Sequence, residues 1–184
     1  MMTRLIALVP FVLLLSSAAL AQTQPATPPA APAAQPPACT TPEHRQFDFW
    51  VGNWNVYRTG TEQQVGTSRI ETLYNGCAIR ENWMPLRGGA GGSLNSWLPQ
   101  EGKWRQTWVD SGNSYAVFEG QYRNDEMVMT GVWAGAAGPG SRPLIRMYWS
   151  RVEGGIRQRG EQSTDNGQTW APNFDFTYRP ANPS

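Results

Sequence analysis

Residues 47–56 read FDFWVGNWNV and join a short helical lead-in to the first of many strands. The lead-in begins at residues 41–43 (Thr-Pro-Glu), which supply a capping hydroxyl, a proline at the first helical position and an acid in the first turn. Gly52 ends this pattern, and strand character begins at Trp54. The sequence therefore predicts a short N-terminal helix, from the cap to about Trp50, that leads directly into a strand.

The rest of the chain consists of short runs with strand character, separated by turns rich in Gly, Asn and Asp. No long helical pattern interrupts the series. Ten strands with short links favour an antiparallel up-and-down arrangement, and closure into a barrel removes the exposed edges. The expected strands are residues 54–58, 65–74, 77–86, 93–98, 103–109, 114–122, 127–133, 144–152, 156–163 and 169–179.

Alternation along these strands places aromatic and polar side chains together. Trp104, Gln106 and Trp108 share one face of their strand, and Glu81 and Trp83 share a face of another. A packed interior is apolar, so such faces are typical of a lumen that holds water or a polar ligand. The alternative is an outer face with solvated charge pairs, and a register error of one residue exchanges the two. The candidate ligand-binding residues are Glu71, Glu81, Trp83, Trp104, Gln106, Trp108 and Arg157.

A short helix followed by Gly52-x-Trp54 resembles the lipocalin (calycin) signature. The resemblance implies that the tryptophan closes the floor of the barrel beneath an arginine from the end of the last strand. Arg179 is the matching residue here, as a cation over an aromatic ring. We therefore expect an all-β, antiparallel, calycin-like barrel of about ten strands, in which Gly52, Trp54 and Arg179 have structural roles.

The chain also resembles a family of uncharacterised exported bacterial proteins over most of residues 47–178. The shared motifs are FDFWVGNWNV, NGC at residues 75–77, ENW at residues 81–83, KWRQTWVD at residues 103–110 and the segment 163–170. This resemblance implies a calycin-like barrel and no established activity. Nitrobindin-like haem barrels share the ten-strand outline, but their haem needs a histidine from the barrel. The single histidine, His44, precedes the barrel, so we expect no cofactor.

Residues 163–170, STDNGQTW, match the Asp-box pattern of sialidase-like propellers. A propeller would repeat the motif, whereas this chain has it once. We interpret it as a hairpin in which Asp165 bonds the turn backbone and Gly167 takes a positive φ, with Trp170 as a structural side chain.

Residues 1–21 have the basic start, apolar run and small-x-small site of a signal peptide, with cleavage predicted after Ala21. The apolar run is shorter than the roughly 20 residues of a spanning helix, so we expect no stable membrane insertion. Residues 22–38 read as a Pro/Ala-rich linker, 39–180 as the barrel domain and 181–184 as a tail. The predicted location is periplasmic or extracellular.

Cys39 and Cys77 both lie in the exported part, where an isolated pair of cysteines predicts a disulfide. Closing this loop would stabilise the fold by about 4 kcal/mol if the effect comes from chain entropy. A metal site is the alternative, but one histidine leaves too few ligands for a Cys/His zinc site. We therefore predict no metal.

Charge excludes several kinds of partner. The chain has 15 basic and 14 acidic residues, and removal of Arg4 with the signal leaves 14 of each. A net charge near zero argues against a nucleic-acid backbone or an anionic membrane as the main partner.

The sequence leaves three kinds of function open. The leading interpretation is an exported lipocalin-like protein that binds a small molecule without catalysis. A carboxylate-based hydrolase or isomerase is the first alternative. Its candidate carboxylates are Glu71, Glu81, Glu119 and Glu161, and the separation of Glu71 from Glu81 is its test. A structural or interaction protein of the cell envelope is the second. A serine or cysteine nucleophile would lack a nearby histidine base, so no catalytic residue is predicted.

Overall fold

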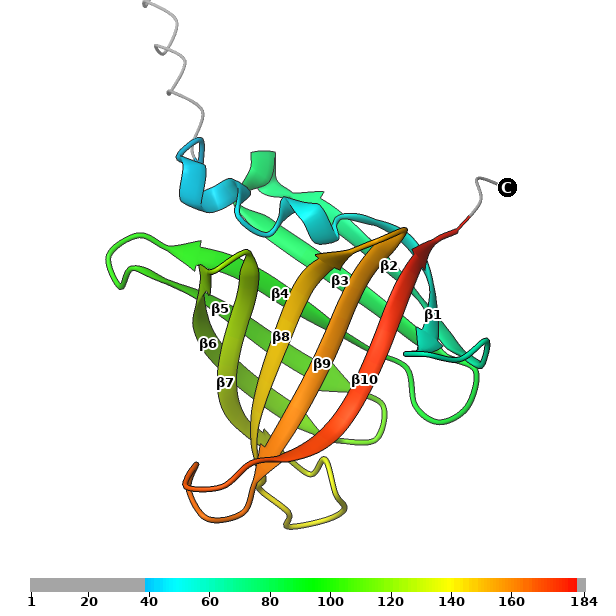
Figure 1. The fold of residues 1–184 in the computed structure, drawn as a ribbon. Helices are drawn as coiled ribbons and strands as arrows, with labels where there is room; N and C mark the ends of the chain where they lie inside the picture. Colours follow the sequence, from blue (N-terminus) through cyan, green and yellow to red (C-terminus); the bar gives the residue numbers. More distant parts are fainter. Residues whose placement is uncertain (1–38, 182–184) are drawn as a thin grey trace, which may run out of the picture. The chain divides into compact units, whose positions relative to one another are not determined.

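The computed structural model describes residues 39–181, which form ten antiparallel strands closed into a barrel (Figure 1). Each strand pairs with its neighbours in sequence, and the first strand closes the barrel against the last. The strands are β1 (Gly52–Arg58), β2 (Gln64–Leu73), β3 (Ala78–Pro85), β4 (Gly91–Leu98), β5 (Lys103–Asp110), β6 (Tyr115–Arg123), β7 (Glu126–Ala134), β8 (Leu144–Val152), β9 (Gly155–Ser163) and β10 (Ala171–Pro180). The predicted up-and-down barrel is confirmed, and each predicted strand agrees within two residues at either end. The predicted signal peptide (1–21) and linker (22–38) lie outside the described residues.

The lead-in consists of two 3-10 turns, η1 (Pro42–Arg45) and η2 (Asp48–Trp50), where one helix was expected. The hydroxyl of Thr41 does not cap a backbone amide; its Oγ1 lies 3.0 Å from Nδ1 of His44. So short a segment cannot sustain a helix by its own hydrogen bonds, and packing decides its conformation. Its fully buried side chains, Phe47 and Trp50, both insert into the end of the barrel.

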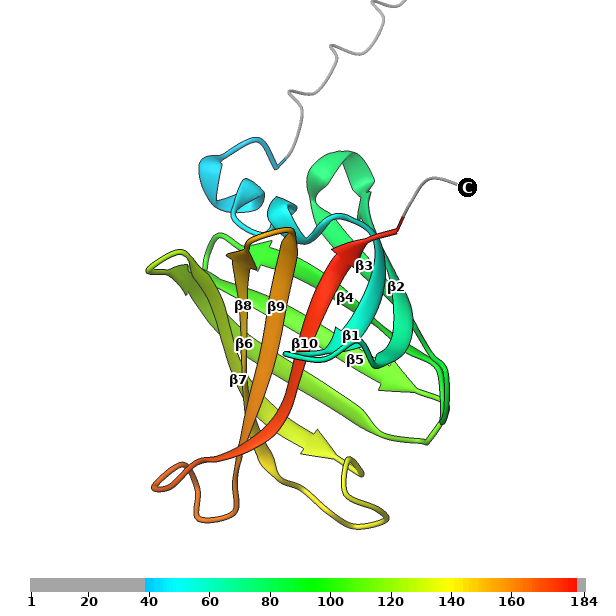
Figure 2. The same cartoon turned by 45° about the vertical axis from the view of Figure 1, so that its right-hand side comes forward.

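The predicted disulfide between Cys39 and Cys77 is confirmed, with Cα atoms 5.0 Å apart. It joins the start of the lead-in to the end of a third turn, η3 (Tyr74–Gly76), which connects β2 to β3. Arg45 strengthens the same junction, since its guanidinium donates to the carbonyl of Gly76. Figure 2 shows the lead-in lying across one end of the barrel beside this turn.

The two ends of the barrel differ in what covers them. The lead-in, η3 and the short turns between β4 and β5, β6 and β7, and β8 and β9 lie at one end, which we call the floor (Figure 1). The connections at residues 59–63, 86–90, 111–114, 135–143 and 164–170 lie at the other end, which we call the mouth. No segment corresponding to the lead-in crosses the mouth among the described residues.

The floor half of the interior is tightly packed with aromatic rings. Phe47 stacks on Trp50 with ring centroids 4.9 Å apart, and its ring contacts Trp104 and Trp149 edge to face at 5.7 and 5.3 Å. All four side chains are almost completely buried. Interlocked aromatic rings of this kind form a stable hydrophobic core.

Gly52 and Trp54 lie at the floor, as the lipocalin resemblance implies, but the expected arginine contact is wrong. The indole nitrogen of Trp54 donates to the carbonyl of Trp50 at 2.9 Å. A Cβ atom on Gly52 would lie 3.0 Å from the Trp54 ring, so glycine lets the ring lie against the backbone. Tyr178 points inward and contacts Trp54 edge to face.

Arg179 follows Tyr178 in the strand and therefore points outward. Its guanidinium pairs with Glu62 at 2.7 Å and lies 4.3 Å from the ring centroid of Tyr57. The cation–π contact exists, but with an outer tyrosine and not with Trp54.

The Asp-box segment forms the hairpin between β9 and β10, as predicted. Asp165 accepts hydrogen bonds from Ser163 and from both the backbone and the hydroxyl of Thr169, which lower the pKa of its carboxyl to about 2. Gly167 has φ +87°, and its carbonyl accepts the indole N–H of Trp170. The motif is thus a self-contained turn.

Candidate functional site

A cavity of about 350 Å³ occupies the mouth half of the barrel. This volume lies near the lower end of the range for small-molecule sites, ~300–1,000 Å³. The lining residues come from β2, β3, β5 to β10 and the loop between β3 and β4. The cavity is therefore a property of the closed barrel and belongs to no single hairpin.

Aromatic side chains form the walls of the cavity in two groups. Trp83 on β3 stacks on Phe176 of β10 with ring centroids 6.1 Å apart, and Phe176 stacks on Phe174 at 5.3 Å. The second group comes from the other side of the strand order, where Trp108 on β5 meets Trp133 on β7 edge to face at 5.7 Å. The cavity thus offers aromatic surface on two sides.

The two tryptophans of the second group are held by the end of β5 and the loop that follows it. The indole nitrogen of Trp108 donates to Asp110 at 3.0 Å, and that of Trp133 donates to Ser114 at 2.8 Å. Ser114 in turn donates to Asp110, so one carboxylate organises both rings. Rings fixed before a ligand arrives lose little conformational entropy on binding.

Glu81 and Gln106 line the base of the cavity, and a group of buried polar side chains lies behind them. The hydroxyls of Ser68 and Ser93 each donate to one carboxylate oxygen of Glu81 at 3.1 Å. Asn95 donates to Ser93 at 3.0 Å, and Gln106 donates to Asn95 at 2.7 Å. The result is a chain of donors that runs from β5 through β4 to the carboxyl group on β3.

Glu81 is the carboxyl group of the cavity, and no Lys, Arg or His of residues 39–181 pairs with it. Burial raises the pKa of Glu81 to about 7, against the lowering effect of the two serine hydroxyls. The pKa of Tyr178, which also lines the base, lies well above its ordinary value because of burial and the charge of Glu81. Its hydroxyl donates to Gln158 at 2.5 Å.

Four of the predicted ligand-binding residues line the cavity: Glu81, Trp83, Gln106 and Trp108. Trp104 points inward as expected, but it lies in the packed floor, where it is 2% exposed and its indole nitrogen donates to Gln46. It does not line the cavity, because the lead-in covers its ring.

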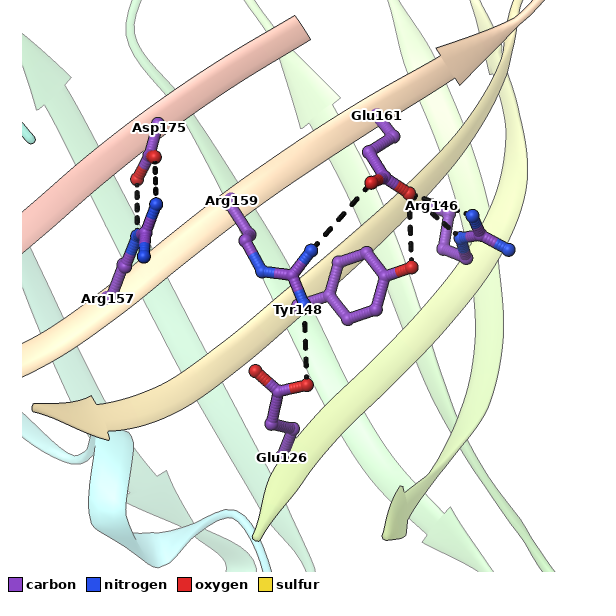
Figure 3. Close-up of polar contacts among 7 residues, drawn as sticks. All are labelled: Glu126, Arg146, Tyr148, Arg157, Arg159, Glu161 and Asp175. Atoms are coloured by element: carbon purple, nitrogen blue, oxygen red, sulfur yellow. Dashed lines mark hydrogen bonds and ion pairs between the residues drawn. The ribbon is translucent and has the colours of Figure 1, made fainter. Parts of the chain in front are cut away.

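The structure places Glu71 and Arg157 on the outer face of the barrel, so the expectation that they face the lumen is wrong. Glu71 pairs with Arg69 and Arg80, each at 2.5 Å. Arg157 pairs with Asp175 on the neighbouring strand β10 (Figure 3). Alternation grouped these residues correctly with their neighbours but could not say which group faces inward.

The outer face of β7 to β10 carries a network that the sequence did not separate from the lumen. Figure 3 shows Glu161 accepting bonds from Arg146 and from the hydroxyl of Tyr148, at 2.8 and 3.1 Å. Arg159 lies over the Tyr148 ring, 3.6 Å from its centroid, and pairs with Glu126. These charges are paired with one another at the solvent-facing surface.

Sequence reasoning missed most of the cavity residues on the later strands. Trp133, Phe174, Phe176, Tyr178 and Gln158 all occupy inward positions. The spacing of two residues in Phe174-x-Phe176-x-Tyr178 is the same alternation that identified the earlier strands, and it could have found the second aromatic wall.

The described residues do not hold the paired carboxylates of a glycosidase-like site. Glu81 lines the cavity, whereas Glu71, Glu119 and Glu161 do not line it and pair with arginine or lysine side chains, so none of them can act with Glu81 on one bond. Residues 39–181 also contain no group of three or more His, Cys, Asp or Glu side chains placed to hold a metal ion. His44 is buried in the lead-in and does not line the cavity.

No protein-family model matches this sequence, and comparison with curated proteins finds no significant match. Within the described part of the chain, no helix has the length and apolar character needed to cross a membrane.

Proposed function

We propose that this protein is an exported, lipocalin-like carrier that binds a small molecule in the mouth half of its barrel, without catalysis. The observation that carries the proposal is a cavity of about 350 Å³ with aromatic walls and a polar base, inside a barrel whose other half is filled. The resemblances of residues 47–56 to lipocalins, and of the chain to exported bacterial proteins, support the same function. The disulfide fits an oxidising compartment outside the cytoplasm.

The arrangement favours binding because the barrel can enclose a small molecule and its polar groups can orient that molecule. Trp83, Trp108 and Trp133 supply flat apolar surface, and the hydrogen bonds of Trp108 to Asp110 and of Trp133 to Ser114 hold two of these rings in place. Glu81 and Gln106 supply polar groups at one end of the cavity. A ligand with an apolar body and one polar end matches this division.

Native mass spectrometry of the protein purified from its own host tests the proposal. We expect a bound mass that is lost in Trp108→Ala, because that ring forms part of the cavity wall. Trp170→Ala is the matched control, since Trp170 packs within the outer hairpin against Arg146 and should retain the ligand. The proposal would be wrong if the protein carries no bound mass when it is isolated gently from its host and binds no small molecule in a screen.

A second candidate, an interaction protein of the cell envelope, is favoured by an exposed apolar area on the outer face. It spans neighbouring strands, because Val109 pairs with Tyr115 and Thr107 lies between Leu94 and Val117. Large apolar areas on a surface mark contact sites for other molecules. Analytical ultracentrifugation tests this role: self-association that Val109→Lys abolishes would support it, and a monomer at all concentrations would count against self-association. The exposed members are Leu94, Val109, Tyr115, Val117 and Val132.

A further inference from the structure

We propose that the ligand of the cavity is a small organic cation, an amine or a quaternary ammonium compound, with ionised Glu81 as its counterion and the aromatic walls around its charged group. This inference rests on the proposed function, because it names the class of ligand for the same cavity.

The first argument is the absence of a protein cation beside Glu81. On the outer face, Glu71, Glu119 and Glu161 each pair with arginine or lysine. Glu81, by contrast, is 5% exposed and is bonded to two serine hydroxyls. A buried carboxylate is costly unless a positive charge balances it. The cavity next to Glu81 is where such a charge can enter.

The second argument is the direction of the hydrogen bonds around the carboxyl group. Ser93 accepts from Asn95 and donates to Glu81, and Asn95 accepts from Gln106. Each dipole in this chain points its positive end toward Glu81, which favours the ionised form. Each carboxylate oxygen accepts one serine bond and has capacity left for a ligand.

The third argument is the aromatic wall. The faces of Trp, Tyr and Phe rings carry partial negative charge and attract cations, tryptophan most strongly. Trp83, Trp108 and Trp133 line this cavity together with Phe174 and Phe176. An anion would face repulsion from the rings and from the ionised carboxylate, and a neutral ligand would gain nothing from the charge of Glu81, which would take up a proton instead. The aromatic wall and Glu81 at the base therefore both favour a positively charged ligand.

The remaining groups around Glu81 are uncharged. Ser68 on β2 and Ser93 on β4 contact it, while Gln158 on β9 and Tyr178 on β10 line the same base. Arg87 is the basic residue of the cavity lining; it lies in the loop between β3 and β4, and its side chain is exposed at the mouth. Water and salt screen a charge in that position.

Binding of the cation is linked to loss of a proton from Glu81. Because burial raises the pKa of this carboxyl to about 7 in the free protein, it is mostly neutral below that pH. A cation with a fixed charge therefore binds more tightly as the pH rises toward 7 and reaches a plateau above it. Linkage gives a roughly 30-fold increase in affinity from about pH 5.5 to about pH 8.

The test uses three probes of similar shape: choline, the uncharged isostere in which tert-butyl replaces its trimethylammonium group, and pivalate as the anion. Binding is measured by isothermal titration calorimetry and by the fluorescence of the cavity tryptophans, at both pH values. The proteins are wild type, Glu81→Gln and the matched control Glu71→Gln, an outer-face residue of the strand beside it. Circular dichroism verifies that each variant is folded.

We expect choline to bind best, to show the pH dependence in wild type and Glu71→Gln, and to lose both affinity and pH dependence in Glu81→Gln. The uncharged isostere should bind with little pH dependence. Preference for the isostere or for pivalate overturns the cationic ligand but leaves the cavity as a binding site. Choline that fails to bind at millimolar concentration also overturns it. If Glu81→Gln does not fold, the pH series in wild type is the test: choline affinity that does not rise with pH overturns the proposal.

Discussion

The floor half and the mouth half of this barrel both have tryptophan and phenylalanine side chains that point inward. They differ in whether the interior of that half is filled. At the floor, Trp104 and Trp149 are almost fully buried because Phe47 and Trp50 of the lead-in insert into the end of the barrel and pack against them. At the mouth, Trp108 and Trp133 are partly exposed to a cavity. An inward tryptophan is therefore core or cavity wall according to what a distant segment supplies.

The largest expected effect separates the two halves by removing one tryptophan from each. Trp50→Ala should lower the free energy of unfolding by about 4 kcal/mol, because it deletes a fully buried ring stacked on Phe47. Trp108→Ala should cost less than half as much, since its ring already borders a cavity. Urea denaturation of both variants measures the difference. Equal losses would mean that the mouth is packed as firmly as the floor.

Removal of the disulfide should loosen the floor and leave the mouth largely unchanged. Cys39→Ser with Cys77→Ser is expected to lower the free energy of unfolding by up to about 4 kcal/mol, given the 38-residue separation. Hydrogen exchange should show lost protection in η1, η2 and η3 before the strand ends at the mouth. A variant with unchanged stability and exchange would show that aromatic packing alone holds the lead-in.

Glu81→Gln should stabilise the protein at alkaline pH, which sharpens the contrast between the polar base and the apolar floor. The folded state raises the pKa of Glu81 from 4.5 to about 7, so it binds this proton more tightly than the unfolded state does. Stability from Glu81 is thus fully present below pH 4.5 and is lost as the pH rises to about 7. We expect a gain of up to about 3 kcal/mol for the variant at about pH 8 and none at about pH 4.

Glu71→Gln should change the stability at alkaline pH in the opposite direction from Glu81→Gln. The pKa of Glu71 is lowered, chiefly by its hydrogen bond with Arg80, so this residue stabilises the folded state above the ordinary glutamate pKa and loses that effect in acid. The variant should therefore be slightly less stable than wild type at alkaline pH. Urea melts across the pH range check both variants, and curves of the same sign would contradict the assignment of Glu81 to the interior.

The smallest effect is expected for Arg157→Gln on the outer wall. Arg157 and Asp175 are each about two-fifths exposed, and such pairs contribute less than about 1 kcal/mol. The variant should also retain any ligand seen by native mass spectrometry, because its side chain does not line the cavity. Loss of the ligand would place Arg157 in the binding machinery after all.

The sequence predicted the strands well because alternation and turn residues act locally. Asn75-Gly76 and Asn166-Gly167 adopt the positive φ angles that these residue types tolerate best, so the turns were found at the right places. The lead-in helix was less well predicted. Its two 3-10 turns depend on Phe47 and Trp50 reaching the barrel interior, a contact that no local pattern contains.

Four of the fifteen cavity-lining residues were also within reach of the sequence. Glu81, Trp83, Gln106 and Trp108 were identified from alternation, and all line the cavity. Glu71 was assigned to the wrong face because alternation separates the two faces of a strand but does not show which face points into the barrel. Asp110 and Ser114 were not predicted as part of the site, because their bonds with Trp108 and Trp133 depend on how β5, β7 and the loop after β5 meet in space.

The sequence by itself determined ten strands, the division of their side chains into two sets, and the pair of cysteines that ties the lead-in down. These follow from the period of two in a strand, from turn chemistry and from the count of thiols. Only closure of the barrel decided which set faces inward, since both faces of an isolated strand are equivalent. Only the docking of the lead-in decided that the inner set is core at the floor and lines a cavity at the mouth. The lead-in fills the floor end with Phe47 and Trp50, and a single segment cannot fill both ends.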